Sequence, residues 1–188
     1  MIREFKSLSH NRRLAVTGHT SGLGQAIYQL YPSSVGFSRS NGYDISNADD
    51  RARIINQSSQ CDVFVNNAYA GNAQIDLLYE LFANWHDSDR FIINISSNSG
   101  DGIKPDPNRY AVYKSALDKA SQQLTYRKSR CKICNLRFGW LDTPRVAHVT
   151  DAKISMADAC DVVQMVLSGS ASGMITEMTV LPKAQRLL

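Results

Sequence analysis

The sequence has no apolar run that approaches the roughly 20 residues needed to cross a bilayer. Its first 13 residues are polar and lack the apolar segment of a secretory signal. The remaining composition, 43% hydrophobic and 20% charged, is that of an ordinary globular protein. We therefore expect a cytoplasmic protein with no membrane partner.

A strong excess of charge is also missing, because 21 lysines and arginines stand against 17 aspartates and glutamates, for a net charge of +4. The basic residues cluster at 3–13 and 127–132, without interleaved aromatic residues and without a recognised nucleic-acid-binding motif. The four histidines show no metal-ligand spacing. These features predict neither a nucleic-acid partner nor a metal site.

Cysteine is scarce, and the four cysteines include a single C-x-x-C, Cys131 to Cys134. A zinc site built from cysteines needs further ligands, and the sequence has no second C-x-x-C. The pair enters an apolar segment typical of a strand, where side chains three positions apart point to opposite faces. We therefore predict that this pair neither binds a metal nor forms a redox couple.

What the sequence does have is an alternation of apolar runs and polar helical segments over 188 residues, the length of one domain. Such an alternation favours a parallel sheet with helices on both faces. The expected fold class is α/β, a Rossmann-like doubly wound domain over residues 13–188 that follows an N-terminal extension, residues 1–12. Strands are expected at 13–17, 34–38, 61–66, 90–96, 132–138 and 177–181, and helices at 23–31, 47–57, 73–85, 107–128 and 155–168.

The most informative segment, TGHTSGLG at 17–24, directly follows the first expected strand. A strand that enters a glycine turn and then a helix can cradle the pyrophosphate of a dinucleotide. Gly18 permits the sharp turn, Gly22 lets the backbone approach the phosphates, and Gly24 lets the helix pack on the strand. The helix N-terminus adds amide donors and partial positive charge. The segment predicts a nucleotide site, although three glycines beside a strand are not specific on their own.

Tyr110 and Lys114 stand four residues apart on an expected helix, which places them on one face about 6 Å apart. A nearby ammonium favours the phenolate, so we expect it to lower the pKa of Tyr110 and allow proton exchange near neutral pH. Ser96 and Ser97 end the apolar strand upstream and could offer a hydroxyl to a substrate oxygen. These residues form a candidate set for acid–base chemistry.

The combination of TGHTSGLG, NNA at 66–68, INISS at 93–97 and YAVYKSAL at 110–117 resembles the short-chain dehydrogenase/reductase family, in that family's order. The resemblance covers residues 13–182 and implies that Tyr110 is the general acid/base. It also implies that Lys114 lowers the pKa of Tyr110 and binds the nicotinamide ribose, while Ser97 polarises the substrate carbonyl. Asn72 resembles the family's helix asparagine that holds a proton-relay water, with a plain helix N-cap as the alternative.

The resemblance also implies the nucleotide contacts. Asn67 and Ala68 would line the adenosine side, and Asp44 with Ile45 would contact the adenine. The segment FGWLDTP at 138–144 resembles the family's PGxxxT element, with Phe138 in place of the proline. The expected cofactor-binding residues are Gly18, Thr20, Ser21, Gly22, Leu23, Gly24, Ser38, Arg39, Asp44, Ile45, Asn67, Ala68, Tyr110, Lys114, Gly139, Leu141 and Thr143.

The end of the second expected strand indicates which nicotinamide cofactor is bound. An acidic residue there would bind the ribose hydroxyls of NAD(H) and repel a 2′-phosphate. The sequence has Ser38 and Arg39 instead, and a guanidinium matches the geometry of a phosphate. NADP(H) is therefore the expected cofactor and NAD(H) the alternative. The resemblance of the 138–144 segment further implies that Leu141 and Thr143 contact the nicotinamide carboxamide.

The chain is short for the family that it resembles. Only four residues separate Arg39 from Asp44, so the sheet should lose a crossover and a strand, or pair that strand through a brief turn. The segment between Thr143 and the helix at 155–168 leaves room for only a small substrate lid. The resemblance implies an enzyme that interconverts a small-molecule carbonyl and an alcohol, of unspecified identity.

Two other functions remain open. A non-catalytic NADP(H)-binding sensor or regulatory protein fits the abbreviated sheet and lid, although it would not need the serine, tyrosine and lysine. A nucleotide-sugar epimerase or reductase usually has GxxGxxG, whereas GxxxGxG is present here.

The resemblance also bears on oligomeric state. Members of the short-chain dehydrogenase/reductase family usually pair through the helices expected here at 73–85 and 107–128, so we expect a homodimer. An apolar stripe that suits either an interface or the core comprises Leu77, Leu78, Leu81 and Phe82.

Overall fold

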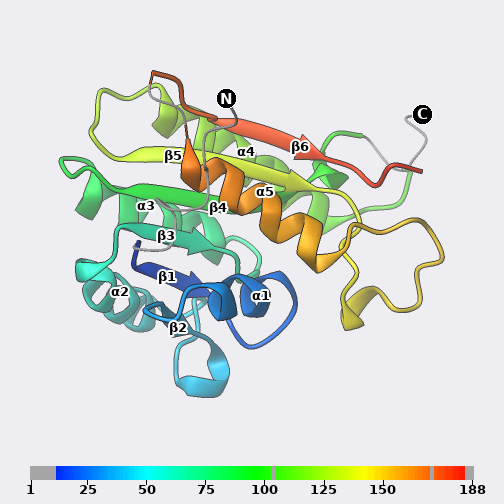
Figure 1. Ribbon diagram of the computed structural model, residues 1–188, viewed down its shortest axis with the longest axis horizontal. Helices are drawn as coiled ribbons and strands as arrows, with labels where there is room; N and C mark the ends of the chain where they lie inside the picture. The colour runs from blue at the N-terminus through cyan, green and yellow to red at the C-terminus, as the bar shows by residue number, and fades with distance from the viewer. Residues whose placement is uncertain (1–11, 103–104, 170–171, 185–188) are drawn as a thin grey trace, which may run out of the picture.

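The computed structural model describes residues 12–102, 105–169 and 172–184 (Figure 1). Its sheet has the strand order β2-β1-β3-β4-β5-β6, and all neighbours are parallel. The strands are β1 (Leu14–Thr17), β2 (Val35–Phe37), β3 (Val63–Asn66), β4 (Phe91–Ser97), β5 (Lys132–Phe138) and β6 (Glu177–Val180). The helices are α1 (Gly22–Leu30), α2 (Ala48–Gln57), α3 (Ala73–Trp85), α4 (Arg109–Thr125) and α5 (Met156–Ser168).

Every expected strand and helix is present, with ends that differ by a few residues, and the Rossmann-like α/β class is confirmed. The expected N-terminal extension lies outside the described residues except for Arg12. No helix within the described ranges is long and apolar enough to cross a membrane. The division of the chain into an extension and a domain stays a prediction.

The shortened segment after β2 determines the edge of the sheet. The chain makes only a 3-10 turn, Arg39–Asn41, before α2, and then enters β3 on the other side of β1. Within the described part of the chain, β2 is therefore an edge strand, and the expected loss of a crossover and a strand is confirmed. The strand order reverses between β1 and β3, which is where open α/β sheets bind ligands.

Helices α1 and α5 cover one face of the sheet, and α2, α3 and α4 cover the other (Figure 1). Alternation along β4 divides its side chains between these faces. Ile93 and Ile95 belong to the apolar cluster beneath α1 and α5, whereas Ile92 packs with α2, α3 and α4. We call these two sides the α1/α5 face and the α2–α4 face.

The α2–α4 face contains a row of buried asparagines, Asn66, Asn94 and Asn135, in register on β3, β4 and β5. Asn66 Nδ2 donates to Asn94 Oδ1 at 2.9 Å, and Asn94 Nδ2 donates to Ser121 Oγ on α4 at 3.0 Å. Asn135 Nδ2 donates to the Asp118 carboxylate, also on α4, at 2.8 Å. Each amide nitrogen of the row has a partner, and the bonds to Ser121 and Asp118 attach α4 to the sheet. The Oδ1 atoms of Asn66 and Asn135, by contrast, are buried without a hydrogen-bond partner among the described residues.

The two cysteines of the C-x-x-C lie on opposite faces of β5, as their spacing predicts. Cys131 packs on the α2–α4 face and Cys134 on the α1/α5 face. Burial raises the pKa of both thiols to about 12. All four cysteines are free and buried, and the described residues contain no group of His, Cys, Asp and Glu placed to hold a metal ion.

The apolar stripe of α3 is part of the core. Its side chains are at most 6% exposed and pack in the cluster of the α2–α4 face. The stripe therefore does not support a dimer interface, and the homodimer stays a prediction. The members of this stripe are Leu77, Leu78, Leu81 and Phe82.

Candidate active site

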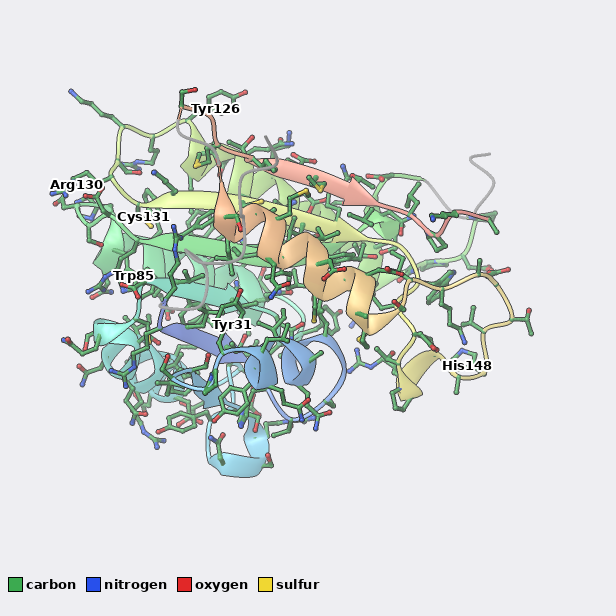
Figure 2. The ribbon with its side chains drawn as sticks, viewed as in Figure 1. Tyr31, Trp85, Tyr126, Arg130, Cys131 and His148 are labelled. Carbon is green, nitrogen blue, oxygen red and sulfur yellow. The ribbon has the colours of Figure 1, made fainter. Side chains whose placement is uncertain are left out.

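A cleft of about 1340 Å³ opens where β1, β3, β4 and β5 end. Figure 1 shows that the strand arrowheads point toward this edge, and Figure 2 places the loop that carries His148 there. Cys131 and Arg130 lie at the opposite edge. All of the expected site residues line the cleft except Asn72 and Gly24.

The glycine turn between β1 and α1 has the geometry expected of a phosphate cradle. Gly18 and Gly22 adopt φ values of +70° and +54°, which favour glycine. A Cβ on Gly24 would lie 2.3 Å from the Gly18 carbonyl oxygen, so the helix could not pack this closely with any other residue. The side chain of Ser21, the N-cap of α1, makes no capping hydrogen bond, which leaves the first amides of α1 available to a ligand.

Thr17 joins the glycine turn to the segment after β3. Its Oγ1 accepts hydrogen bonds from the backbone amides of Asn67 at 2.9 Å and Ala68 at 3.0 Å. Asn67 Nδ2 returns a bond to the Thr17 carbonyl at 2.9 Å. The two expected adenosine-side residues are therefore held in place against β1.

The other end of the cleft contains the segment that follows β2. The Ser38 amide donates to Asn41 Oδ1 at 2.7 Å, and this turn presents the exposed Arg39 to the cleft. The Asp44 carboxylate accepts bonds from the Ser46 hydroxyl at 2.7 Å and the Ser46 amide at 2.9 Å. These bonds, with a smaller contribution from the charge of Arg39, lower the pKa of Asp44. Ile45 is buried beside it.

Lys114 projects from α4 to the base of the cleft and is only 3% exposed. Its Nζ donates to Gln74 Oε1 and to the Ile95 carbonyl, both at 2.8 Å. The same atom lies 5.6 Å from the centre of the Tyr110 ring and 5.5 Å from that of Tyr69. Burial among these neutral groups lowers the pKa of Lys114 to about 7.

Tyr110 lies half-buried beside Tyr69, whose ring meets it edge-on with centroids 4.9 Å apart. Burial raises the pKa of Tyr110, and a hydrogen-bonding interaction with the Ser97 hydroxyl lowers it to a smaller extent. The expected lowering of this pKa is therefore wrong. The reason is that burial disfavours both the phenolate and the ammonium that was expected to stabilise it.

The two serines at the end of β4 point in different directions. Ser96 donates its hydroxyl hydrogen to the Asp118 carboxylate on the α2–α4 face. Ser97 turns to the cleft, where it interacts with Tyr110 and its Oγ accepts a bond from the Ser99 amide at 3.2 Å. Alternation along the strand thus separates a structural serine from one that can meet a substrate.

Asn72 is not part of the site. It is exposed at the N-cap of α3 and its Nδ2 donates to Asp76 Oδ1 at 2.8 Å, without a capping hydrogen bond to the helix amides. The segment after β3 is short, and α3 turns this residue outward. Two positions later, Gln74 points inward and is 1% exposed. Sequence reasoning missed Gln74, which contacts Lys114 directly.

The segment after β5 lines the cleft although Phe138 stands where the family that the sequence resembles has a proline. Phe138 is buried at the end of β5, and the Gly139 amide donates to the Val180 carbonyl at 2.8 Å. Thr143 then approaches the glycine turn, since a Cβ on Gly22 would lie 3.2 Å from Thr143 Cγ2. Gly139, Leu141 and Thr143 all line the cleft, as expected of a nicotinamide end.

Comparisons with known proteins bear on the fold. The sequence matches no family model. It also matches no curated protein. Among solved structures, an alcohol dehydrogenase from the archaeon Thermococcus sibiricus complexed with 5-hydroxy-NADP is 13% identical, with a TM-score of 0.73 over 94% of this chain and 99% of that one.

Two further structures are similar. A short-chain dehydrogenase/reductase from Vibrio parahaemolyticus is 18% identical, with a TM-score of 0.71 over 91% of this chain and 100% of that one. A 3-ketoacyl-(acyl-carrier-protein) reductase from Brucella melitensis complexed with NADH is 14% identical, with a TM-score of 0.73 over 92% of this chain and 96% of that one. The chain therefore has the fold of the short-chain dehydrogenases and reductases.

Proposed function

We propose that this protein is a compact short-chain dehydrogenase/reductase that interconverts a carbonyl compound and an alcohol by hydride transfer with NADP(H). The observation that carries the proposal is the meeting of Ser97, Tyr110 and Lys114 in one cleft, beside the uncapped N-terminus of α1. The solved relatives support it, because they are oxidoreductases and are complexed with NADP or NADH. Their fold alone does not select a substrate.

The residues of the cleft fit a nicotinamide dinucleotide. The glycine turn and the first amides of α1 would hold the pyrophosphate. Asn67 and Ala68 would line the adenosine, and Lys114 would bind the nicotinamide ribose. At the end of β2, Ser38 and Arg39 offer a hydroxyl and a guanidinium to a 2′-phosphate, with no acidic residue at these positions to repel it. This arrangement favours NADP(H) over NAD(H).

Carbonyl reduction adds a hydride to carbon and a proton to oxygen. When bound, the reduced nicotinamide supplies the hydride. Ser97 and Tyr110 donate hydrogen bonds to the carbonyl oxygen and stabilise the negative charge that develops there. Tyr110 then transfers its proton to that oxygen, and solvent returns a proton to the phenolate. The raised pKa of Tyr110 keeps the phenol protonated at neutral pH, which is the form that reduction requires.

The central experiment compares wild type with Tyr110→Phe for NADPH oxidation in the presence of a panel of carbonyl compounds. We expect Tyr110→Phe to lower kcat/KM by about 100-fold or more, because it lacks the proton donor. NADPH affinity, measured by fluorescence titration, should change little. Tyr126→Phe is the matched control, since Tyr126 ends α4 at the other edge of the molecule and is 90% exposed (Figure 2).

Two outcomes would contradict the proposal. Equal turnover by wild type and Tyr110→Phe would remove Tyr110 from the reaction. Tight NADPH binding without turnover on any carbonyl would instead favour the non-catalytic sensor.

The choice of cofactor is tested by replacing Arg39. Arg39→Ala should weaken NADPH binding by about 10- to 100-fold, because a charge-assisted pair with the 2′-phosphate is lost. NADH binding should be unaffected by the same change. A wild-type protein that binds NADH at least as tightly as NADPH would show that the end of β2 was misinterpreted.

A further inference from the structure

We propose that the substrate of this cleft is an oxo acid, whose carboxylate is bound by Arg145. The inference rests on the proposed carbonyl reduction and names the substrate class for that reaction. It depends on the distribution of charge along the cleft, on how the loop that carries Arg145 is held, and on the place of Arg145 in the same cleft as Ser97 and Tyr110.

Charge is distributed unequally along the cleft. Only four of the described residues that line it carry a charged side chain: Arg39, Asp44, Lys114 and Arg145. Arg39 and Asp44 belong to the end that follows β2. The catalytic end, where Ser97 and Tyr110 lie, therefore has the cationic Arg145, the basic side chain of Lys114 and no carboxylate among the described lining residues. A site of this composition favours an anion over a neutral compound.

Arg145 is available to such an anion. Other arginines of this chain are paired, for example Arg51 with Glu80 at 2.8 Å and Arg137 with Glu177 at 2.9 Å. Over residues 12–102, 105–169 and 172–184, Arg145 has no carboxylate within ion-pair distance. A guanidinium presents parallel N–H donors that match a carboxylate in a bidentate arrangement.

The loop that carries Arg145 is held at its base. Leu141 forms a parallel bridge with Ile154, and the Ile154 amide donates to the Trp140 carbonyl at 2.7 Å. Arg145 itself lies in the 3-10 turn Pro144–Val146, which the Val146 amide closes by donating to the Thr143 carbonyl at 3.0 Å. The guanidinium therefore extends from a backbone anchored at the nicotinamide end of the cleft.

Arg145 also lies close enough to the reacting groups to act on them electrostatically. Burial has the largest effect on both groups, raising the pKa of Tyr110 and lowering that of Lys114. The Asp118 carboxylate raises both pKa values, and the positive charge of Arg145 lowers both. A carboxylate bound to Arg145 would offset that charge while the carbonyl of the same molecule meets Ser97 and Tyr110. Oxo acids carry a carboxylate and a carbonyl on one short chain. One small molecule can therefore place its carboxylate at Arg145 and its carbonyl at Ser97 and Tyr110.

A phosphate of the cofactor is the other anion that Arg145 could bind in this cleft. The pyrophosphate already has donors in the glycine turn, and the 2′-phosphate has Ser38 and Arg39 at the opposite end. We therefore assign Arg145 to the substrate. The experiment separates the two cases because cofactor affinity and acid affinity are measured independently.

The kinetic arm pairs short 2-oxo and 3-oxo acids with their methyl esters, which keep the carbonyl but lack the charge. For the preferred acid, wild type should show a kcat/KM about 10- to 100-fold above that of the ester, the range expected of a charge-assisted contact. Arg145→Ala should remove that preference, so that its kcat/KM values for acid and ester become similar, and Arg145→Lys should restore part of it. Arg127→Ala is the control, because Arg127 is exposed, adjoins Tyr126 and does not line the cleft.

The binding arm requires no turnover. Calorimetry measures the affinity of short hydroxy acids for wild type and Arg145→Ala, each saturated with NADP+. We expect the acid to bind wild type and to lose about 10-fold or more in affinity in Arg145→Ala, with NADP+ affinity unchanged.

Two results would overturn the inference: equal handling of acids and esters by wild type, or a loss of NADP+ affinity in Arg145→Ala with acid binding retained. Acid binding that depends on Arg145, without turnover of any carbonyl, would instead support the anion site and contradict the proposed reduction.

Discussion

The two faces of the sheet differ in what they bury. On the α1/α5 face the packed cluster is apolar throughout, with side chains such as Val16, Ile93 and Leu136 fully buried. On the α2–α4 face an apolar cluster of similar size shares its space with buried polar groups, among them Asn94, Gln74 and Lys114. Of the buried polar side chains on the strands that the structure describes, only that of Ser97 faces away from the α2–α4 face.

This difference shows that the free-energy cost of burying polar groups falls on the α2–α4 face. Burying a lysine and its amide neighbours requires that their polar atoms be paired, since an unpaired buried polar group costs about 1–3 kcal/mol. On the α2–α4 face Lys114 Nζ is paired with Gln74 and the Ile95 carbonyl. The asparagine row pairs its amide nitrogens, while the Oδ1 atoms of Asn66 and Asn135 bear this cost unpaired among the described residues. Among the residues that the structure describes, no buried lysine, asparagine or glutamine side chain lies on the α1/α5 face, whose side chains pack as an apolar cluster.

The largest effect on stability is expected from Leu136→Ala on the α1/α5 face. Leu136 is fully buried in β5, so the substitution leaves a cavity and should lower the free energy of unfolding by about 2–5 kcal/mol. Urea denaturation measures this loss, and NADPH affinity of the remaining folded protein should be unchanged. Leu30→Ala, at a side chain that is 40% exposed, is the control and should cost far less. Equal losses for the two variants would show that this face is not tightly packed.

Lys114→Met tests the titratable group of the α2–α4 face. The pKa of Lys114 is about 7 in the folded protein and 10.5 ordinarily. As the pH falls through this window, unfolded chains take up the proton before folded chains do, so the wild type loses about 1 kcal/mol of stability per pH unit.

The variant lacks this dependence. Plotted against pH, the stability difference between wild type and Lys114→Met should therefore rise toward alkaline pH, as measured by urea denaturation at several pH values. Lys119→Met, at an exposed neighbour on α4, should run parallel to wild type. Parallel curves for Lys114→Met as well would contradict a buried neutral lysine.

A smaller effect on the pH dependence of stability is expected from Gln74→Glu, which tests the contact between Gln74 and Lys114. The substitution places a carboxylate next to Lys114 Nζ, where Gln74 Oε1 now lies at 2.8 Å. An opposite charge at this distance should raise the pKa of Lys114 by about 1–3 units. The loss of stability on lowering the pH should still begin near the ordinary lysine pKa of 10.5 but end at a more alkaline pH than in wild type, so that it spans a narrower window. Gln25→Glu, on the exposed side of α1, should leave the curve unchanged.

The sequence predicted the elements of both faces because their signals are local. Apolar strands, the turn with Gly18 and Gly22, and the four-residue spacing of Tyr110 and Lys114 each need only a short segment. That Asn72 lies outside the cleft could not be predicted, because the direction in which a residue at the start of α3 points depends on how that helix is rotated over β3 and β4. The raised pKa of Tyr110 depends on burial, which only the assembled cleft produces.

The asparagine row has a signal in the sequence from which it could have been predicted. Each of β3, β4 and β5 has asparagine as its fourth residue, in VFVN, FIIN and KICN. Because parallel strands in register place equal positions side by side, this repetition indicates a polar row across one face. Gln74, by contrast, left no such signal, since one glutamine on a helix has many possible environments.

The most direct test of the account follows the hydride and the proton in one assay. NADPH carrying deuterium at the transferable position of the nicotinamide is incubated with a carbonyl substrate, and the alcohol is analysed by mass spectrometry. Wild type should yield alcohol with deuterium on the former carbonyl carbon, Leu136→Ala the same per folded molecule, and Tyr110→Phe almost none. Deuterium-labelled alcohol formed equally well by Tyr110→Phe, or no labelled alcohol from wild type with any carbonyl tested, would contradict it.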